Sequence, residues 1–146
     1  MKDPAPNSSR FFSLTDSSID TQSLKQQIAS DSAGAHCIFE GIVRNHNEGL
    51  AVSGLRYSAY ESMAIKEGQA IINNAFKAFE IEKAVCIHRI GTLIVGDTAV
   101  WVGVSAAHRD PAFRACRFII DTIKREVPIW KREDYLHTTS AWVKPN

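Results

Sequence analysis

The chain has 146 residues, a net charge of +1, 45% hydrophobic and 23% charged residues, and only 5 Pro and 8 Gly. These proportions are typical of one soluble globular domain, and they exclude a disordered chain, a collagen-like repeat and a solenoid. Apolar runs, such as residues 118–120, are far shorter than the roughly 18 residues that a membrane span requires. We therefore expect a protein that does not cross a membrane.

The first ten residues, MKDPAPNSSR, are polar and proline-containing, and no apolar segment of a secretory signal follows their charges. We expect residues 1–10 to be a disordered lead-in to a single domain over residues 11–146. Cys37, Cys86 and Cys116 form no CxxC pair. This spacing indicates buried thiols in a reducing compartment rather than a zinc cage or disulfides, which favours the cytoplasm.

The first third of the chain predicts a helix and two strands. Ser18 or Asp20 can cap a short helix that ends near Ser30. Residues 34–43 (GAHCIFEGIV) are typical of a strand, and a polar, turn-prone segment over 44–49 follows. Residues 52–60 alternate imperfectly between apolar and polar side chains. We expect them to pair with 34–43 as a hairpin with a long loop.

The middle of the chain predicts a covering helix and a second hairpin. Over residues 61–80, apolar side chains recur at three- and four-residue steps, which is the period of an amphipathic helix. Residues 83–90 and 98–106 are typical of strands, and Gly96 and Asp97 indicate a turn between them. The apolar positions of the helix are Ile65, Ile72, Ala75, Phe76 and Phe79.

The last third predicts a long helix and two short strands. Asp110 and Pro111 provide a cap residue and a first-turn proline, and the helix should end near Val127. Residues 129–133 and 141–144 are expected to be strands. The fold class is therefore α+β, with a mixed, mainly antiparallel sheet packed with two long helices. The predicted core face of the last helix comprises Phe113, Cys116, Ile120, Ile123 and Val127.

The net charge hides a basic segment over residues 107–132, which has seven basic and three acidic side chains. Such a concentration of positive charge can attract an anion, although a solvated helix face would also explain it. A phosphate- or RNA-binding module that uses this segment is the alternative function. No glycine-rich, aromatic RNA-binding motif or zinc-finger pattern supports that alternative.

Four side chains of this segment are candidates for chemistry: Lys124, His108, Arg109 and Lys131. Lys124 lies at the border of the apolar helix face, where burial and nearby arginines would lower the pKa of its amine, unless the amine reaches solvent. His108 and Arg109 lie where a strand ends and a helix begins, and the start of a helix favours binding of an anion. A polar turn is the simpler explanation of these two residues. Lys131 and Trp130 should point to opposite faces of a strand.

The five histidines show no HExxH or HxH spacing, and no carboxylate cluster stands beside them. We therefore expect no metal site, and nothing in the sequence calls for a cofactor.

Four motifs, in order, carry a family resemblance: residues 41–47 (GIVRNHN), 88–91 (HRIG), 105–109 (SAAHR) and 128–133 (PIWKRE). The sequence closely resembles the large, catalytic subunit of molybdopterin synthase over roughly residues 34–143. The resemblance implies an α/β-hammerhead-like fold and a domain of that family over 11–146. It also implies a sulfurtransferase that converts cyclic pyranopterin monophosphate into molybdopterin in molybdenum cofactor biosynthesis.

The resemblance also assigns the site. Lys124 and Lys131 match the family's two active-site lysines and are the expected catalytic residues. The expected substrate-binding residues are these two lysines together with Ile42, Val43, Arg44, His108, Arg109, Arg132 and Glu133.

The implied partners are a small ubiquitin-like subunit and a second copy of this chain. The small subunit donates sulfur as a thiocarboxylate on its C-terminal Gly-Gly tail. A helix that starts near Ala112 places Lys124 roughly 18 Å along its axis from His108 and Arg109, which one small substrate cannot span. We therefore expect a pocket shared across a homodimer, within the heterotetramer that the resemblance implies, and no nucleic-acid partner.

Overall fold

The computed structural model describes residues 9–136 and 139–143, which form two sheets and three helices. The first sheet has the strand order β1-β5-β7-β2, in which β1 and β5 are parallel and the other neighbours antiparallel. Its strands are β1 (Arg10–Thr15), β2 (Ala35–Ile42), β5 (Lys83–Arg89) and β7 (Thr98–Ala106). The helices are α1 (Thr21–Gln27), α2 (Glu61–Ala78) and α3 (Arg109–Glu126).

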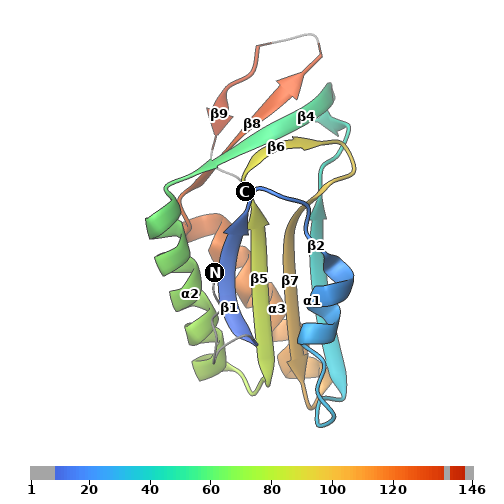
Figure 1. Cartoon of the computed structure of the whole chain (residues 1–146), viewed down its shortest axis with the longest axis vertical. Coiled ribbons are helices and arrows are strands. Elements are labelled where there is room, and N and C mark those ends of the chain that lie inside the picture. Colours follow the sequence, from blue (N-terminus) through green and yellow to red (C-terminus); the bar gives the residue numbers. More distant parts are fainter. Residues whose placement is uncertain (1–8, 137–138, 144–146) are drawn as a thin grey trace.

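The three helices cover both faces of this sheet. Helices α2 and α3 contact each other and pack on one face, and α1 lies on the other, as Figure 1 shows. The alternation of β7 supplies both cores, because Val102 points into the α2–α3 side and Trp101 into the α1 side. Both residues are almost fully buried. The larger core therefore lies between the sheet and the two long helices.

The second sheet lies across one end of the first (Figure 1). Strand β4 is its centre, pairing with β3, β6 and β8, and β9 follows at the edge. Among its register pairs, Tyr57 lies opposite Lys131 and Leu55 opposite Glu133. Its strands are β3 (His46–Asn47), β4 (Leu50–Ala59), β6 (Gly91–Ile94), β8 (Ile129–Tyr135) and β9 (Trp142–Val143).

Two connections between the sheets touch each other. The chain leaves β4 for α2 at Tyr60, and it leaves α3 for β8 through Val127 and Pro128. The backbone N–H of Tyr60 donates to the Pro128 carbonyl over 3.1 Å. The connection between β4 and α2 is thereby held against the connection between α3 and β8, close to the predicted site residues Lys124 and Lys131.

The expected α+β class is confirmed, and much of the local structure follows the sequence. Helix α1 begins where Asp20 accepts a hydrogen bond from the Ser23 N–H, as the capping prediction requires. Helix α2 and the antiparallel pair of β5 and β7 are also confirmed. Cys86 and Cys116 are buried, Cys37 is half-buried, and all three are free thiols.

The predicted hairpin between residues 34–43 and 52–60 is wrong. Strand β2 pairs with β7 in the first sheet, whereas β4 belongs to the second. The intervening loop contains β3, which forms its own tight hairpin with β4, with Asn47 opposite Leu50. Glu48 and Gly49 both have positive φ in this turn. The turn-prone segment thus reverses the chain after β3, not between the two long strands.

Besides β3, two strands escaped prediction. Arg10, expected to end the lead-in, instead begins β1, which pairs with β5. Residues 1–8 of the lead-in and Lys144 of the last predicted strand lie outside the described residues. Strand β6 is only four residues long and follows Gly91. Both strands are too short for a periodic pattern, and pairing with distant strands stabilises them.

The helix faces are partly different from the prediction. Helix α3 begins at Arg109, with His108 rather than Asp110 as its N-cap and no side-chain cap hydrogen bond. Phe113 and Ile65, predicted to be buried, are 60% and 45% exposed. The buried face of α3 comes from smaller residues such as Ala112 and Ala115, which allow the helix to approach the sheet closely. In the described part of the chain, no helix is long and apolar enough to cross a membrane.

Candidate active site

A cavity of about 200 Å³ lies where the two sheets meet. Lys124 enters it from the last turn of α3, and Lys131 enters it from β8. Arg44, in the loop after β2, adds a third positive charge. The wall is completed by Gly41, Ile42, Val43, Leu55, Tyr57, Ala99, Val100 and Glu133.

Lys124 has an unusual environment for an amine. It is half-buried, and burial followed by the positive charge of Lys131 lowers its pKa below the ordinary 10.5. A lower pKa leaves a larger fraction of the amine neutral near pH 7. Lys124 can therefore accept a proton or an acyl group more readily than a surface lysine.

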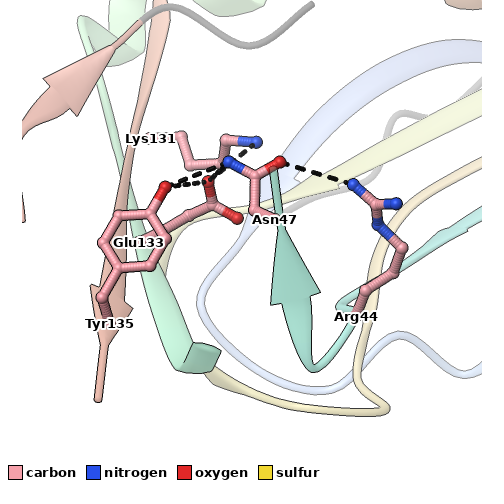
Figure 2. Close-up of polar contacts among 5 residues, drawn as sticks. All are labelled: Arg44, Asn47, Lys131, Glu133 and Tyr135. Carbon is pink, nitrogen blue, oxygen red and sulfur yellow. Dashed lines mark hydrogen bonds and ion pairs between the residues drawn. The ribbon is translucent and has the colours of Figure 1, made fainter. Parts of the chain in front are cut away.

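Lys131 and Glu133 lie on the same face of β8, because strand side chains alternate. The Lys131 Nζ atom is 3.9 Å from Glu133 Oε1, and their side chains are only 23% and 11% exposed. Glu133 Oε1 also accepts hydrogen bonds from the Asn47 side-chain amide, at 2.7 Å, and from the Tyr135 hydroxyl, at 3.2 Å (Figure 2). The carboxylate is thus held by neighbours on two strands.

Tyr57 contributes a protonated hydroxyl to the cavity wall. Burial, and then the negative charge of Glu133, raise the pKa of Tyr57 to about 12. Its ring meets the His88 ring edge to face, with centroids 4.8 Å apart. Tyr57 is therefore a neutral hydrogen-bonding group near neutral pH.

Six of the nine predicted site residues share this cavity: Ile42, Val43, Arg44, Lys124, Lys131 and Glu133. The structure places the other three elsewhere. Arg132 points to the opposite face of β8, where its Nε lies 3.5 Å from Asp134 Oδ1 and its guanidinium lies over the Trp142 ring. His108 and Arg109 are exposed at the other end of α3, and Arg109 is about 22 Å along the helix axis from Lys124.

Several residues of the site were missed. Leu55 and Tyr57 were placed on a strand but given no role, since their strand was assigned to the wrong partner. Tyr135 was missed because the predicted strand ended at Glu133. With the strand two residues longer, the two-residue period of Lys131, Glu133 and Tyr135 would have put all three on one face. Asn47 lies in a motif of the resemblance, but nothing in the sequence connects it to Glu133.

The remaining charge of the basic segment is largely paired on the surface of α3. Arg114 lies 3.7 Å from Asp110, and Arg117 lies 3.4 Å from Asp121, all with exposed side chains. Arg125 pairs similarly with Glu126. These pairs fit the solvated helix face, and they give the RNA-binding alternative no continuous basic surface. Across residues 9–136 and 139–143, no three His, Cys, Asp or Glu side chains are grouped to hold a metal ion.

Known structures share this fold over nearly the whole chain. The molybdopterin synthase crystal structure from Staphylococcus aureus has a TM-score of 0.84 and 33% identity, covering 92% of this chain and 96% of its own. Protein E of molybdopterin cofactor biosynthesis from Burkholderia multivorans has a TM-score of 0.77 and 28% identity, covering 92% and 88%. The fold, with 33% identity over nearly the full length of both chains, thus places the chain among molybdopterin synthases.

Sequence comparisons define the family. The MoaE protein model matches residues 14–126. The molybdopterin synthase catalytic subunit of Thermoplasma volcanium is 40% identical over 90% of this chain and 96% of its own. That of Pyrococcus abyssi is 49% identical over 73% and 72%. The chain belongs to the MoaE family of molybdopterin synthase catalytic subunits, sulfurtransferases of molybdenum cofactor biosynthesis.

Proposed function

We propose that the cavity between the two sheets binds cyclic pyranopterin monophosphate and the thiocarboxylate tail of a small ubiquitin-like subunit. Sulfur passes from that tail to the substrate, in two rounds, to give the dithiolene of molybdopterin. The observation that carries this proposal is the convergence of Lys124, Lys131 and Arg44 on one cavity. Both proposed ligands are anions, and three cations around one small cavity suit them.

The proposed reaction gives the amines of Lys124 and Lys131 different roles. In each round, the thiocarboxylate sulfur bonds to a ring carbon of the substrate as a carbon–oxygen bond at that carbon breaks. In one round the oxygen leaves as the cyclic phosphate opens, and in the other it leaves as water. Water then cleaves the acyl–sulfur bond, so that sulfur stays on the substrate and the tail leaves as a carboxylate. The lowered pKa of Lys124 suits it to accept a proton or to hold the acyl group briefly. Lys131, as a cation, stabilises the negative charge that develops on the substrate.

We propose that a second copy of this chain completes the pocket. His108 and Arg109 are too far from Lys124 to meet the same substrate within one chain, but they begin a helix, where anions bind favourably. In a two-fold dimer with antiparallel helices, the start of one α3 lies near the end of the other. Each pocket then receives His108 and Arg109 from the partner copy, next to its own Lys124 and Lys131.

The face for this dimer is the groove between β2 and α3. Strand β2 is an edge of the first sheet, with its outer backbone groups unpaired by any described strand. The exposed side chains of Ile38, Phe39 and Phe113 border the groove, which encloses about 490 Å³. An exposed apolar groove beside an open strand edge is suited to burial against a copy of itself.

The small partner is supported by the relatives' names. Those relatives are called catalytic subunits, which implies at least one other subunit in their enzymes. A structure of the same fold, 21% identical, is a protein–protein complex of subunits 1 and 2 of the molybdopterin-converting factor of Helicobacter pylori. We propose a heterotetramer of two copies of this chain and two small subunits. We place it in the cytoplasm, where the three free thiols stay reduced.

The decisive experiment incubates the purified chain with a thiocarboxylated small subunit and cyclic pyranopterin monophosphate, and measures molybdopterin. Product should form with the thiocarboxylate and not with the plain carboxylate tail. Lys131→Ala should reduce the rate by about 100-fold, whereas Lys66→Ala, an exposed lysine on α2, should leave it unchanged. Absence of product where a known synthase works would refute the proposal.

A further inference from the structure

Asn47 joins the two charged walls of the cavity. It lies on β3, outside the cavity lining itself, and is half-buried. Its side-chain nitrogen donates to Glu133 Oε1 at 2.7 Å and contacts the Tyr135 hydroxyl at 3.0 Å. Its side-chain oxygen accepts from the Arg44 guanidinium at 3.5 Å. Figure 2 shows Asn47 between Arg44 on one side and Lys131, Glu133 and Tyr135 on the other.

The chemistry of these partners fixes the direction of the amide. Arg44 can only donate, and the Glu133 carboxylate can only accept, so the amide oxygen must face Arg44 and the nitrogen must face Glu133. Asp cannot meet both demands, because it lacks a donor, and Ala meets neither. An asparagine of this length is thus specifically suited to connect a guanidinium to a carboxylate.

The contacts of Glu133 explain what this connection does. A direct hydrogen bond between an ammonium and a carboxylate is typically about 2.8 Å long. Lys131 Nζ instead lies 3.9 Å from Glu133 Oε1, an oxygen that already accepts hydrogen bonds from Asn47 and Tyr135. These two donors anchor Oε1 of the carboxylate, so the carboxylate does not close on the amine.

We propose that Asn47 is a positioning residue of the sulfur-transfer site, which rests on the function proposed above. It holds Glu133 back from Lys131, leaving that amine directed to the cavity, and it steadies Arg44 on the opposite wall. Removing the Asn47 amide frees Glu133 to bind Lys131 directly. The charged or titratable groups around Lys131 are Glu133 and Tyr135 on its own strand, Lys124 from α3, Tyr57 from β4 and Arg44 from the loop after β2.

The test measures the reactivity of Lys131 without substrate. The full chain is treated briefly with acetic anhydride at pH 8, and acetylation of Lys131 is quantified by peptide mass spectrometry against exposed Lys66. In Asn47→Ala, acetylation of Lys131 relative to Lys66 should fall about 10-fold, the value of one hydrogen bond to a charged group. The matched control is Asn45→Ala, in the same loop, whose side chain bonds only to His46 among the described contacts. It should behave as the wild type.

Rescue separates positioning from a general structural effect. In the double variant of Asn47→Ala with Glu133→Gln, no charge remains to capture Lys131, so its acetylation should recover. If Asn47→Ala fails to fold, the nearly isosteric Asn47→Asp replaces it, and repulsion between the two carboxylates should again drive Glu133 onto Lys131 and reduce acetylation. Unchanged Lys131 acetylation in folded Asn47→Ala or Asn47→Asp, or no recovery in the double variant, would overturn the proposal.

Turnover distinguishes this proposal from the function on which it rests. In Asn47→Ala, kcat for molybdopterin formation should fall because Lys131 is engaged, and KM should rise because Arg44 is loosened, whereas Asn45→Ala should change neither. If the wild type forms no molybdopterin while Lys131 acetylation responds as described, the sulfur-transfer function fails and the positioning of Lys131 by Asn47 stands. If the wild type is active and Lys131 acetylation does not respond, the positioning role fails alone.

Discussion

Mixing two inactive variants tests whether each site is built from two chains. Lys131→Ala removes an amine that β8 places in the cavity, and His108→Ala removes the side chain at the start of α3, the end of the helix far from Lys124. Each variant alone should lose about 100-fold of its activity. If the two side chains serve one site only across the dimer, a mixed dimer has one doubly damaged site and one intact site.

The expected recovery follows from counting sites. After unfolding and refolding of an equal mixture, half of the dimers are mixed, and half of the sites in those dimers are intact. The mixture should therefore regain about 25% of wild-type molybdopterin formation, far above either variant alone. The matched control mixes Lys131→Ala with Lys124→Ala. Both lesions then lie in the same half of the site, no intact site can form, and activity should stay at the level of the single variants.

The assay is molybdopterin formation at saturating small subunit, with the proportion of mixed dimers measured by native mass spectrometry. Activity equal to the mean of the two pure variants, in a sample that contains the expected mixed dimers, would refute sharing of the site. Equal recovery in the control mixture would also refute it, because Lys124 and Lys131 of one site would then not come from the same chain.

Three further outcomes are expected. Phe113→Glu places a charge on the β2–α3 groove and should raise the dimer dissociation constant, measured by sedimentation, at least ~30-fold. Ile94→Glu changes a similarly exposed side chain on β6 and should leave the dissociation constant unchanged. If the two variants form equally stable dimers, the dimer does not use this face. Lys124→Met should raise Tm at pH 7, because a lowered pKa makes the charged amine unfavourable in the fold. This gain should disappear as the pH rises through 10.5, where the unfolded amine also becomes neutral, and a gain independent of pH would contradict that cause. Gly68→Ala adds a Cβ that collides with the Phe12 ring and should destabilise the fold by about 2 kcal/mol in urea unfolding. Phe12→Leu should reduce that cost, and an equal cost in both backgrounds would contradict this cause.

Local periodicity predicted much of the fold, because it depends on neighbours in sequence. Both ends of strand β7 were predicted correctly, since its many Val and Trp residues favour a strand. Helices α2 and α3 were predicted from the spacing of their apolar residues. The partners of β4 could not be predicted this way. Tyr57 pairs with Lys131, which is far along the chain, and no local pattern specifies such a pairing.

In the site, too, features that depend on neighbouring residues could be predicted, and contacts between residues far apart in the sequence could not. The position of Lys124 at the border of a helix face was visible from spacing, and the half-buried amine agrees with it. The exposure of Phe113 could not be predicted, because a large apolar residue next to the buried helix face has the same local pattern whether it packs on the sheet or stays exposed. The Asn47 network depends on the contact between β3 and β8, which only the folded chain brings together.

The short connection from α3 to β8 sets the spacing of the two amines that line the cavity. Lys124 belongs to the helix on the first sheet and Lys131 to the second sheet, yet only Val127 and Pro128 separate the two elements. Val127 is fully buried, Pro128 has a restricted φ, and the Pro128 carbonyl is bonded to Tyr60. One residue inserted here would shift Val127 or Ile129, both of which lie in the larger core, as well as move one amine relative to the other. The length of this connection therefore fixes together the packing of the core and the separation of the two amines.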